Sequence, residues 1–102
     1  MALQSTDVDV SDAAATPIAA GNARRTLLAI TNMGPNPVCV GGPDVTGAEG
    51  LVLAASVDGA PGGQLILTRA DADAAVTEAW YAVALSAAQT GDENTYVLEA
   101  IG

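Results

Sequence analysis

The stretch of sequence that decides the fold covers residues 24–42 and reads RRTLLAITNMGPNPVCVGG. Its first eight residues alternate, with Leu28 and Ile30 on one face and Arg25 and Thr31 on the other, as in a strand that buries one side. The segment NMGPNP that follows is turn chemistry, because its prolines fix φ and bias the residues before them towards extended backbone. The apolar run VCV then indicates a returning strand.

Short apolar runs separated by turn residues recur after this stretch. They lie at residues 50–54, 64–68 and 95–101. Together with the two strands above they make five short strands, a spacing typical of a sandwich or barrel rather than of alternating βαβ units. The fold class that we predict is therefore all-β, a small antiparallel β-sandwich or barrel.

Residues 71–88 fit two periods at once. Asp71 and Asp73 suit the first turn of a helix, where the helix dipole favours negative charge. Tyr81 and Leu85, by contrast, belong to an alternating pattern that is typical of a strand. The residues that fall at helical spacing, and so favour a helix, are Ala72, Val76, Ala79, Trp80, Val83 and Ala87. Periodicity alone leaves both structures open.

Residues 1–23 differ from the rest of the chain, since an acidic alternating segment is followed by small residues. Such a segment has little apolar bulk to bury on its own. Three interpretations stay open: a short edge strand, an arm that orders on a partner, or a frayed terminus. We divide the chain into an extended N-terminal arm, residues 1–23, and a single β domain, residues 24–102.

The charge balance excludes several classes of function. The 102 residues contain three Lys plus Arg, all of them Arg, against twelve Asp plus Glu, and no His, for a net charge of −9. Three cations cannot neutralise a run of phosphates, so we expect no nucleic-acid partner. Without histidine, the triads that use an imidazole base are impossible. We therefore expect that the protein is not an enzyme.

The sequence also predicts no metal, no cofactor and no membrane span. Cys39 is the one cysteine, which excludes an internal disulfide and a Cys-based zinc site. Its place in the apolar run VCV predicts a buried, inert thiol. Asp71 does not begin a calcium loop, because the sixth position is Val76 and not glycine. No signal-peptide pattern and no apolar segment of spanning length occurs, so we expect synthesis in a reducing compartment.

Several motifs together resemble a recurrent small β domain of tailed-bacteriophage virion structural proteins. Residues 24–42 carry its Arg-led strand, its Asn–Gly turn, its Asn-Pro-Val step and its Gly-Gly pair. The later matches are Val45-Thr46, GLVL at residues 50–53, YAVA at residues 81–84 and VLE at residues 97–99. The resemblance covers about half of the chain and rests on turn chemistry rather than on a catalytic signature. The connection over residues 56–78 is longer and more acidic than the pattern, and the N-terminal arm lies outside it.

The resemblance implies that the aromatic segment is a strand, so we predict one short helical turn near residues 70–77 and a strand at residues 79–85. It also implies a virion structural protein, most simply a capsid decoration or cement protein on the outer capsid surface. Its partners would be the major capsid protein and further copies of itself, as a homo-oligomer, after synthesis in the host cytoplasm. Alternatives are a head-fibre, tail or head–tail junction component, or, in another class, a carbohydrate-binding β module.

Cations are so scarce that Arg24 and Arg25 are candidate interface residues. One interpretation pairs them across subunits with the acidic arm of a neighbour, at Asp7, Asp9 and Asp12, since an Arg–carboxylate fork fixes register. The other places them at the end of a strand in solvent, where a surface pair contributes roughly 0–1 kcal/mol.

The adjacent aromatics Trp80 and Tyr81 are the remaining candidates. On a strand, neighbouring side chains point to opposite faces. We therefore expect one of the two in the core and the other available as an interface anchor, without a signal that tells which is which.

Overall fold

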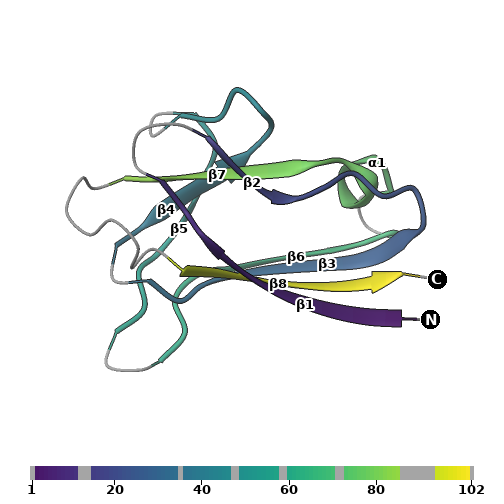
Figure 1. Cartoon of the computed structure of the whole chain (residues 1–102), viewed down its shortest axis with the longest axis horizontal. Coiled ribbons are helices and arrows are strands. Elements are labelled where there is room, and N and C mark those ends of the chain that lie inside the picture. Colours follow the sequence, from purple (N-terminus) through teal and green to yellow (C-terminus); the bar gives the residue numbers. More distant parts are fainter. Residues whose placement is uncertain are drawn as a thin grey trace.

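Two antiparallel four-stranded sheets pack face to face in the computed structural model of the chain (Figure 1). The structure describes residues 2–11, 15–34, 36–46, 49–57, 60–70, 73–85 and 94–101. Its elements are β1 (Ala2–Asp9), β2 (Thr16–Ala19), β3 (Arg25–Asn32), β4 (Val38–Gly41), β5 (Leu51–Leu53), β6 (Gln64–Thr68), α1 (Asp73–Thr77), β7 (Trp80–Ala84) and β8 (Asn94–Ile101).

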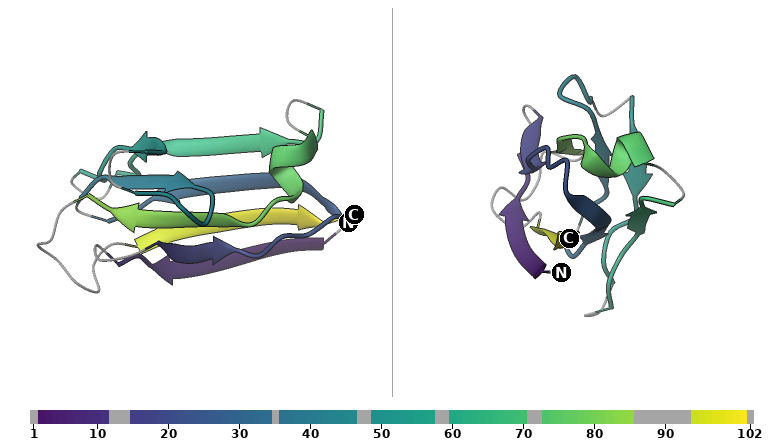
Figure 2. Two further views of the ribbon diagram at one scale, coloured as in Figure 1. Left: turned by 90° about the horizontal axis from the view of Figure 1, so that it is seen from above. Right: turned by 90° about the vertical axis from the view of Figure 1, so that its right-hand side faces the viewer.

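The two sheets interleave along the chain. Sheet A has the strand order β1-β8-β3-β6, and sheet B has the order β2-β7-β4-β5. The chain changes sheet at every connection except the one from β4 to β5. The two ends of the chain lie side by side, because Ala2 pairs with Ile101 (Figures 1 and 2). The predicted all-β fold is confirmed as a sandwich, with its helical turn at α1 and its aromatic strand at β7.

The core lies between the inner faces of the sheets, and β3 supplies its centre. Leu28 and Ile30 are fully buried, as their alternation predicted. They face small and branched side chains of sheet B, and Val76 of α1 closes one end of the same cluster. The other buried members are Val10, Ile18, Ala19, Val38, Val40, Leu53, Ala82, Ala84 and Val97.

The described part of residues 1–23 contributes one edge strand to each sheet. β1 pairs with β8 along its whole length, and β2 pairs with β7. Val10 and Ile18 from this segment are buried in the common core. Of the three interpretations that the sequence left open, the structure shows the edge strand.

The turn after β3 is held by the side chain of Asn32, which is fully buried. Its Nδ2 donates to the carbonyl oxygens of Asn36 (2.9 Å), Leu53 (3.2 Å) and Ala54 (3.0 Å). Its Oδ1 accepts a hydrogen bond from the backbone N–H of Gly34 (2.9 Å). One amide therefore joins sheet A to the end of β5 in sheet B.

Candidate functional site

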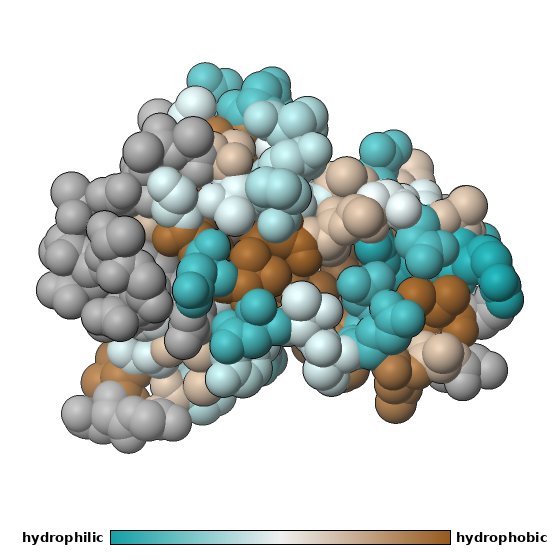
Figure 3. Space-filling model, in the orientation of Figure 1, coloured by the Kyte–Doolittle hydropathy of each residue, from teal (hydrophilic) through white to brown (hydrophobic). Residues whose placement is uncertain are grey.

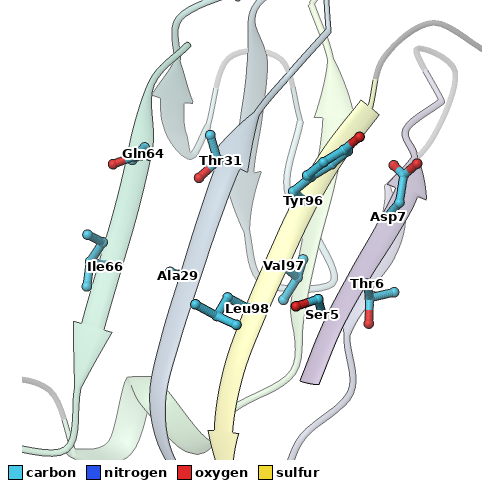
Figure 4. A pocket seen from close by; sticks show the side chains of 10 residues that line it. All are labelled: Ser5, Thr6, Asp7, Ala29, Thr31, Gln64, Ile66, Tyr96, Val97 and Leu98. Carbon is cyan, nitrogen blue, oxygen red and sulfur yellow. The ribbon is translucent and has the colours of Figure 1, made fainter. Parts of the chain in front are cut away.

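The outer face of sheet A is an apolar surface that the described residues leave open. The register of the four strands sets Ser5, Leu98, Ala29 and Ile66 in one row across the sheet. The next row holds Asp7, Tyr96, Thr31 and Gln64. Figure 4 shows these side chains along the faces of four neighbouring strands, around an open depression of about 470 Å³. Such a shape suits a protein surface better than an enclosed small ligand.

Large apolar side chains are exposed on this face. The exposed fractions are 69% for Leu3, 59% for Ile66, 49% for Tyr96 and 40% for Leu98. Leu3 lies diagonally across from Leu98, because Leu3 pairs with Ala100 in the same ladder. Figure 3 shows apolar colour at the end of the molecule where β1 begins and β8 ends. Large exposed apolar side chains gathered on one face of a small domain are typical of an interaction surface.

The outer face of sheet B, unlike that of sheet A, is partly covered by a loop of the chain. There Cys39 and Val83 are buried, although they point away from the main core. Val45, from the loop after β4, lies over them and is itself buried. Gly50 allows this covering, because its φ is +151° and an added Cβ would lie 2.6 Å from the Cys39 Sγ. The predicted buried thiol is confirmed, and burial raises the pKa of Cys39.

The edge at β1 is the longest of the four sheet edges. β1 pairs with β8 over eight residues with no shift of register, and all of its side chains except Val8 are exposed. β2 contains Pro17 and a register shift. β5 has three residues, and β6 has five and contacts α1. Figure 2 shows β1 along the margin of the molecule.

The predicted acidic residues lie on this strand. Asp7 and Asp9 are exposed on β1, opposite Tyr96 and Asn94 respectively. Asp12 lies outside the described residues. The carboxylates therefore border the open face of sheet A, and they do so near the end of β1 that is distant from Ala2.

The structure gives Arg25 an internal role that sequence reasoning missed. The alternation placed it on the face opposite Leu28, but it is only 1% exposed. The physical reason is a shift in the β3–β8 register between Arg25 and Leu27, which turns the guanidinium inward.

The Arg25 guanidinium meets four parts of the same chain. Its Nε donates to Glu99 Oε2 (3.0 Å) on β8. Its Nη1 donates to the carbonyl oxygens of Val76 and Glu78, each at 3.0 Å. Its Nη2 donates to the carbonyl oxygen of Ala20. The carboxylate partner of Arg25 is thus on its own chain, while its neighbour Arg24 is exposed.

Trp80 and Tyr81 point to opposite faces of sheet B, as predicted, and the structure tells which is which. Trp80 packs against the main core, and its indole N–H donates to the carbonyl oxygen of Ala75 (2.9 Å). Its ring also lines a hollow of about 230 Å³ beside Glu78. Tyr81 is half-buried on the outer face, against Cys39 and its neighbours.

Sequence reasoning missed the side chains of β8 and β6 that make the open face. The sequence signal for this face was the strand pattern of the run TYVLEAI, in which Tyr96 and Leu98 point to one face and Val97, between them, points to the other. All three are apolar, so the pattern did not tell which face is inside.

Over the described ranges no group of three or more His, Cys, Asp or Glu residues is placed to hold a metal ion. Within the same ranges no helix has the length and apolar character needed to cross a membrane. Comparison of the chain with protein-family models, with curated proteins and with solved structures finds no match.

Proposed function

We propose that this chain is a structural protein of a bacteriophage virion that decorates the outer capsid surface and stabilises the head. The observation that carries the proposal is the open outer face of sheet A, bordered by the long β1 edge. A small sandwich with an exposed apolar face and a strongly acidic surface has the features of a binding module. The turn and strand motifs that resemble virion β domains lie in β3, β4, β5, β7 and β8 and in the turns beside them; of these strands, β3 and β8 belong to sheet A.

In this role the chain acts by binding to other protein subunits and catalyses no reaction. The face spans the four strands of sheet A. In the proposed role each contact through this face is weak on its own. Many copies bound to a repeating surface, or to one another, reinforce the shell because each contact raises the local concentration for the next. The partners are then the major capsid protein and neighbouring copies of this chain.

Counting copies per particle tests this proposal and separates it from its nearest alternatives. Purified particles of the phage that encodes the chain are analysed by quantitative mass spectrometry against the major capsid subunit. We expect hundreds of copies. About a dozen copies would move the protein to a head-fibre, tail or head–tail junction position, and no copies would overturn a virion role.

One observation favours a second candidate, a carbohydrate-binding module. Trp80 lines a small hollow with Glu78 and with Gly41 and Gly42 at the end of β4, and an aromatic ring beside a carboxylate suits a sugar. Titration of the full chain with a panel of glycans tests this candidate. It requires saturable binding that Trp80→Leu weakens while Tyr96→Thr, on the opposite sheet, leaves it unchanged.

A further inference from the structure

We propose that the β1 edge binds an extended, positively charged segment of the partner protein, which adds to sheet A as a further strand beside β1. The inference deepens the proposed function, because it names the chemistry of the partner at the same surface. It rests on three features: the open backbone of β1, the two carboxylates on it, and the position of the arginines.

The backbone of β1 offers the pairing groups. In an antiparallel ladder every second residue directs its N–H and C=O groups away from its partner strand. β1 has β8 on one side, so its other side presents these groups along about 27 Å, at 3.4 Å per residue. Natural sheets protect such edges with proline, bulges or short strands. Those devices occur at β2 and β5, and β1 has neither a proline nor a register shift.

The charges on β1 select the partner. Leu3, Ser5, Asp7 and Asp9 share the outer side of the strand, since they alternate along it and Ser5 and Asp7 line the open face. An added strand would therefore set two of its side chains beside the carboxylates and two beside Leu3 and Ser5. Cations at the first pair of positions and apolar residues at the second fit this surface.

The chain itself does not supply those cations. Asp9 pairs with Asn94 at one end of sheet A, whereas Arg25 pairs with Ile101 at the other end. Arg24 precedes β3 and Arg69 follows β6, so both also lie at the Ile101 end. Each of the three arginines in the sequence is thus distant from Asp9 along the strands.

A second copy of the chain is a poor occupant for the same reason. Antiparallel pairing of two β1 strands would gather two copies of Asp7 and two of Asp9 along one seam. In the register that pairs Ser5 with Asp7, the two Asp7 carboxylates lie on the diagonal between the strands, where like charges repel each other. The carboxylates therefore discourage self-pairing and favour a basic strand, a use of edge charge that natural sheets show.

The test uses the full chain and synthetic peptides as probes. The first peptide has eight residues, with lysine at positions 1 and 3, valine at positions 5 and 7, threonine at the positions between and after them, and blocked ends. A second replaces each lysine with glutamate, and a third keeps the lysines but has proline at its two central positions. Binding is followed by amide NMR spectra and by hydrogen exchange. We expect the lysine–valine peptide to shift and protect amides of Ala2–Asp9, and the other two peptides to bind at least about tenfold more weakly.

Two variants complete the design. Asp7→Asn combined with Asp9→Asn should raise the Kd of the lysine–valine peptide about fivefold to tenfold, since each exposed pair contributes modestly. The matched control is Asp44→Asn, an exposed carboxylate in the loop after β4, which should leave the Kd unchanged.

Three results would overturn the inference. They are no saturable binding at millimolar peptide, equal binding of the proline peptide, and dimerisation of the free chain through β1. The peptide titration tests this inference and the particle count tests the proposed function, so the result of one does not determine the result of the other. If the chain is found in hundreds of copies per particle but its β1 edge does not bind the peptide, the proposed function stands and this inference is wrong.

Discussion

At the scale of single residues, Arg25 makes the side-chain hydrogen bonds that join several elements at one end of the sandwich. Its guanidinium bonds to β8, to α1, to the turn after α1 and to the residue that follows β2. Removal of one partner from a buried ion pair leaves the other charge without compensation.

We therefore predict that Arg25→Ala lowers the free energy of unfolding by about 3–5 kcal/mol, the cost of breaking a buried pair. Urea denaturation followed by circular dichroism measures the change. The matched control is Arg24→Ala, whose side chain is exposed and whose loss should cost less than about 1 kcal/mol. Equal effects of the two substitutions would contradict the internal role of Arg25.

Cys39 gives a prediction about pH. Because burial raises the pKa of its thiol, the native state favours the neutral form. This contribution to stability is complete below the ordinary thiol pKa, roughly 8.5, and is lost as the pH rises through the higher native value. We predict that the free energy of unfolding falls between pH 8 and pH 9.5 more steeply in the wild type than in Cys39→Ala. Parallel profiles would show that the thiol is not desolvated.

The sequence predicted the positions of some single residues and missed others, for a physical reason. Leu28 and Ile30 were predictable because strand alternation marks a buried face. Arg25 was not, since its burial depends on a register shift against β8 that no local pattern encodes. Tyr96 and Leu98 were missed because every side chain in the run from Tyr96 to Leu98 is apolar.

At the scale of elements, the turns decide how the two sheets meet. The backbone N–H of Gly62 donates to the carbonyl oxygen of Asn32 (2.9 Å), in the connection that leads from β5 to β6. A Cβ on Gly62 would lie 2.2 Å from the carbonyl oxygen of Ala54. Only glycine permits this approach of two backbones. The segment therefore cannot accept a side chain without moving the end of β5.

We predict that Gly62→Ala lowers the free energy of unfolding by at least about 2 kcal/mol, in the range of overpacking in a tight site. Gly42→Ala is the control, because its Cβ would meet only Asp44 Oδ1, at 3.4 Å. Its effect should stay below about 1 kcal/mol. Thermal or urea denaturation of both variants decides the question, and a neutral Gly62→Ala would refute the close packing of the turn.

The elements themselves were largely predictable from the sequence. Turn residues bounded the runs that became β3 to β6 and β8, and the strand at β7 followed from the resemblance to virion β domains. The pairing of residues 1–23 was harder. β1 has no buried side chain, and only Val8 is partly buried, so its place beside β8 depends on backbone hydrogen bonds that leave no mark in the hydrophobic pattern.

At the scale of the whole molecule, the net charge of −9 opposes the compact state through self-repulsion. Salt screens this repulsion, with a Debye length of about 10 Å at 0.1 M. We predict that the free energy of unfolding in urea rises by about 1 kcal/mol between 20 mM and 500 mM NaCl, an order-of-magnitude figure for screened surface charge. A decrease with salt would mean that favourable ion pairs outweigh repulsion.

In the proposed role, the outer face of sheet A holds the chain on the capsid. The most direct measurement is the equilibrium binding of labelled chain to particles that lack it, for a face variant and a matched control. The face variant is Tyr96→Thr with Leu98→Thr, and the control is Val52→Thr, an equally exposed apolar residue in sheet B. Threonine maintains strand propensity in both.

We predict that the face variant binds at least about tenfold more weakly, as expected for the loss of two apolar contacts near the centre of an interface, and that the control binds like the wild type. Unfolding curves verify that both variants stay folded. If the folded face variant binds the particles as tightly as the wild type, the outer face of sheet A is not the binding surface.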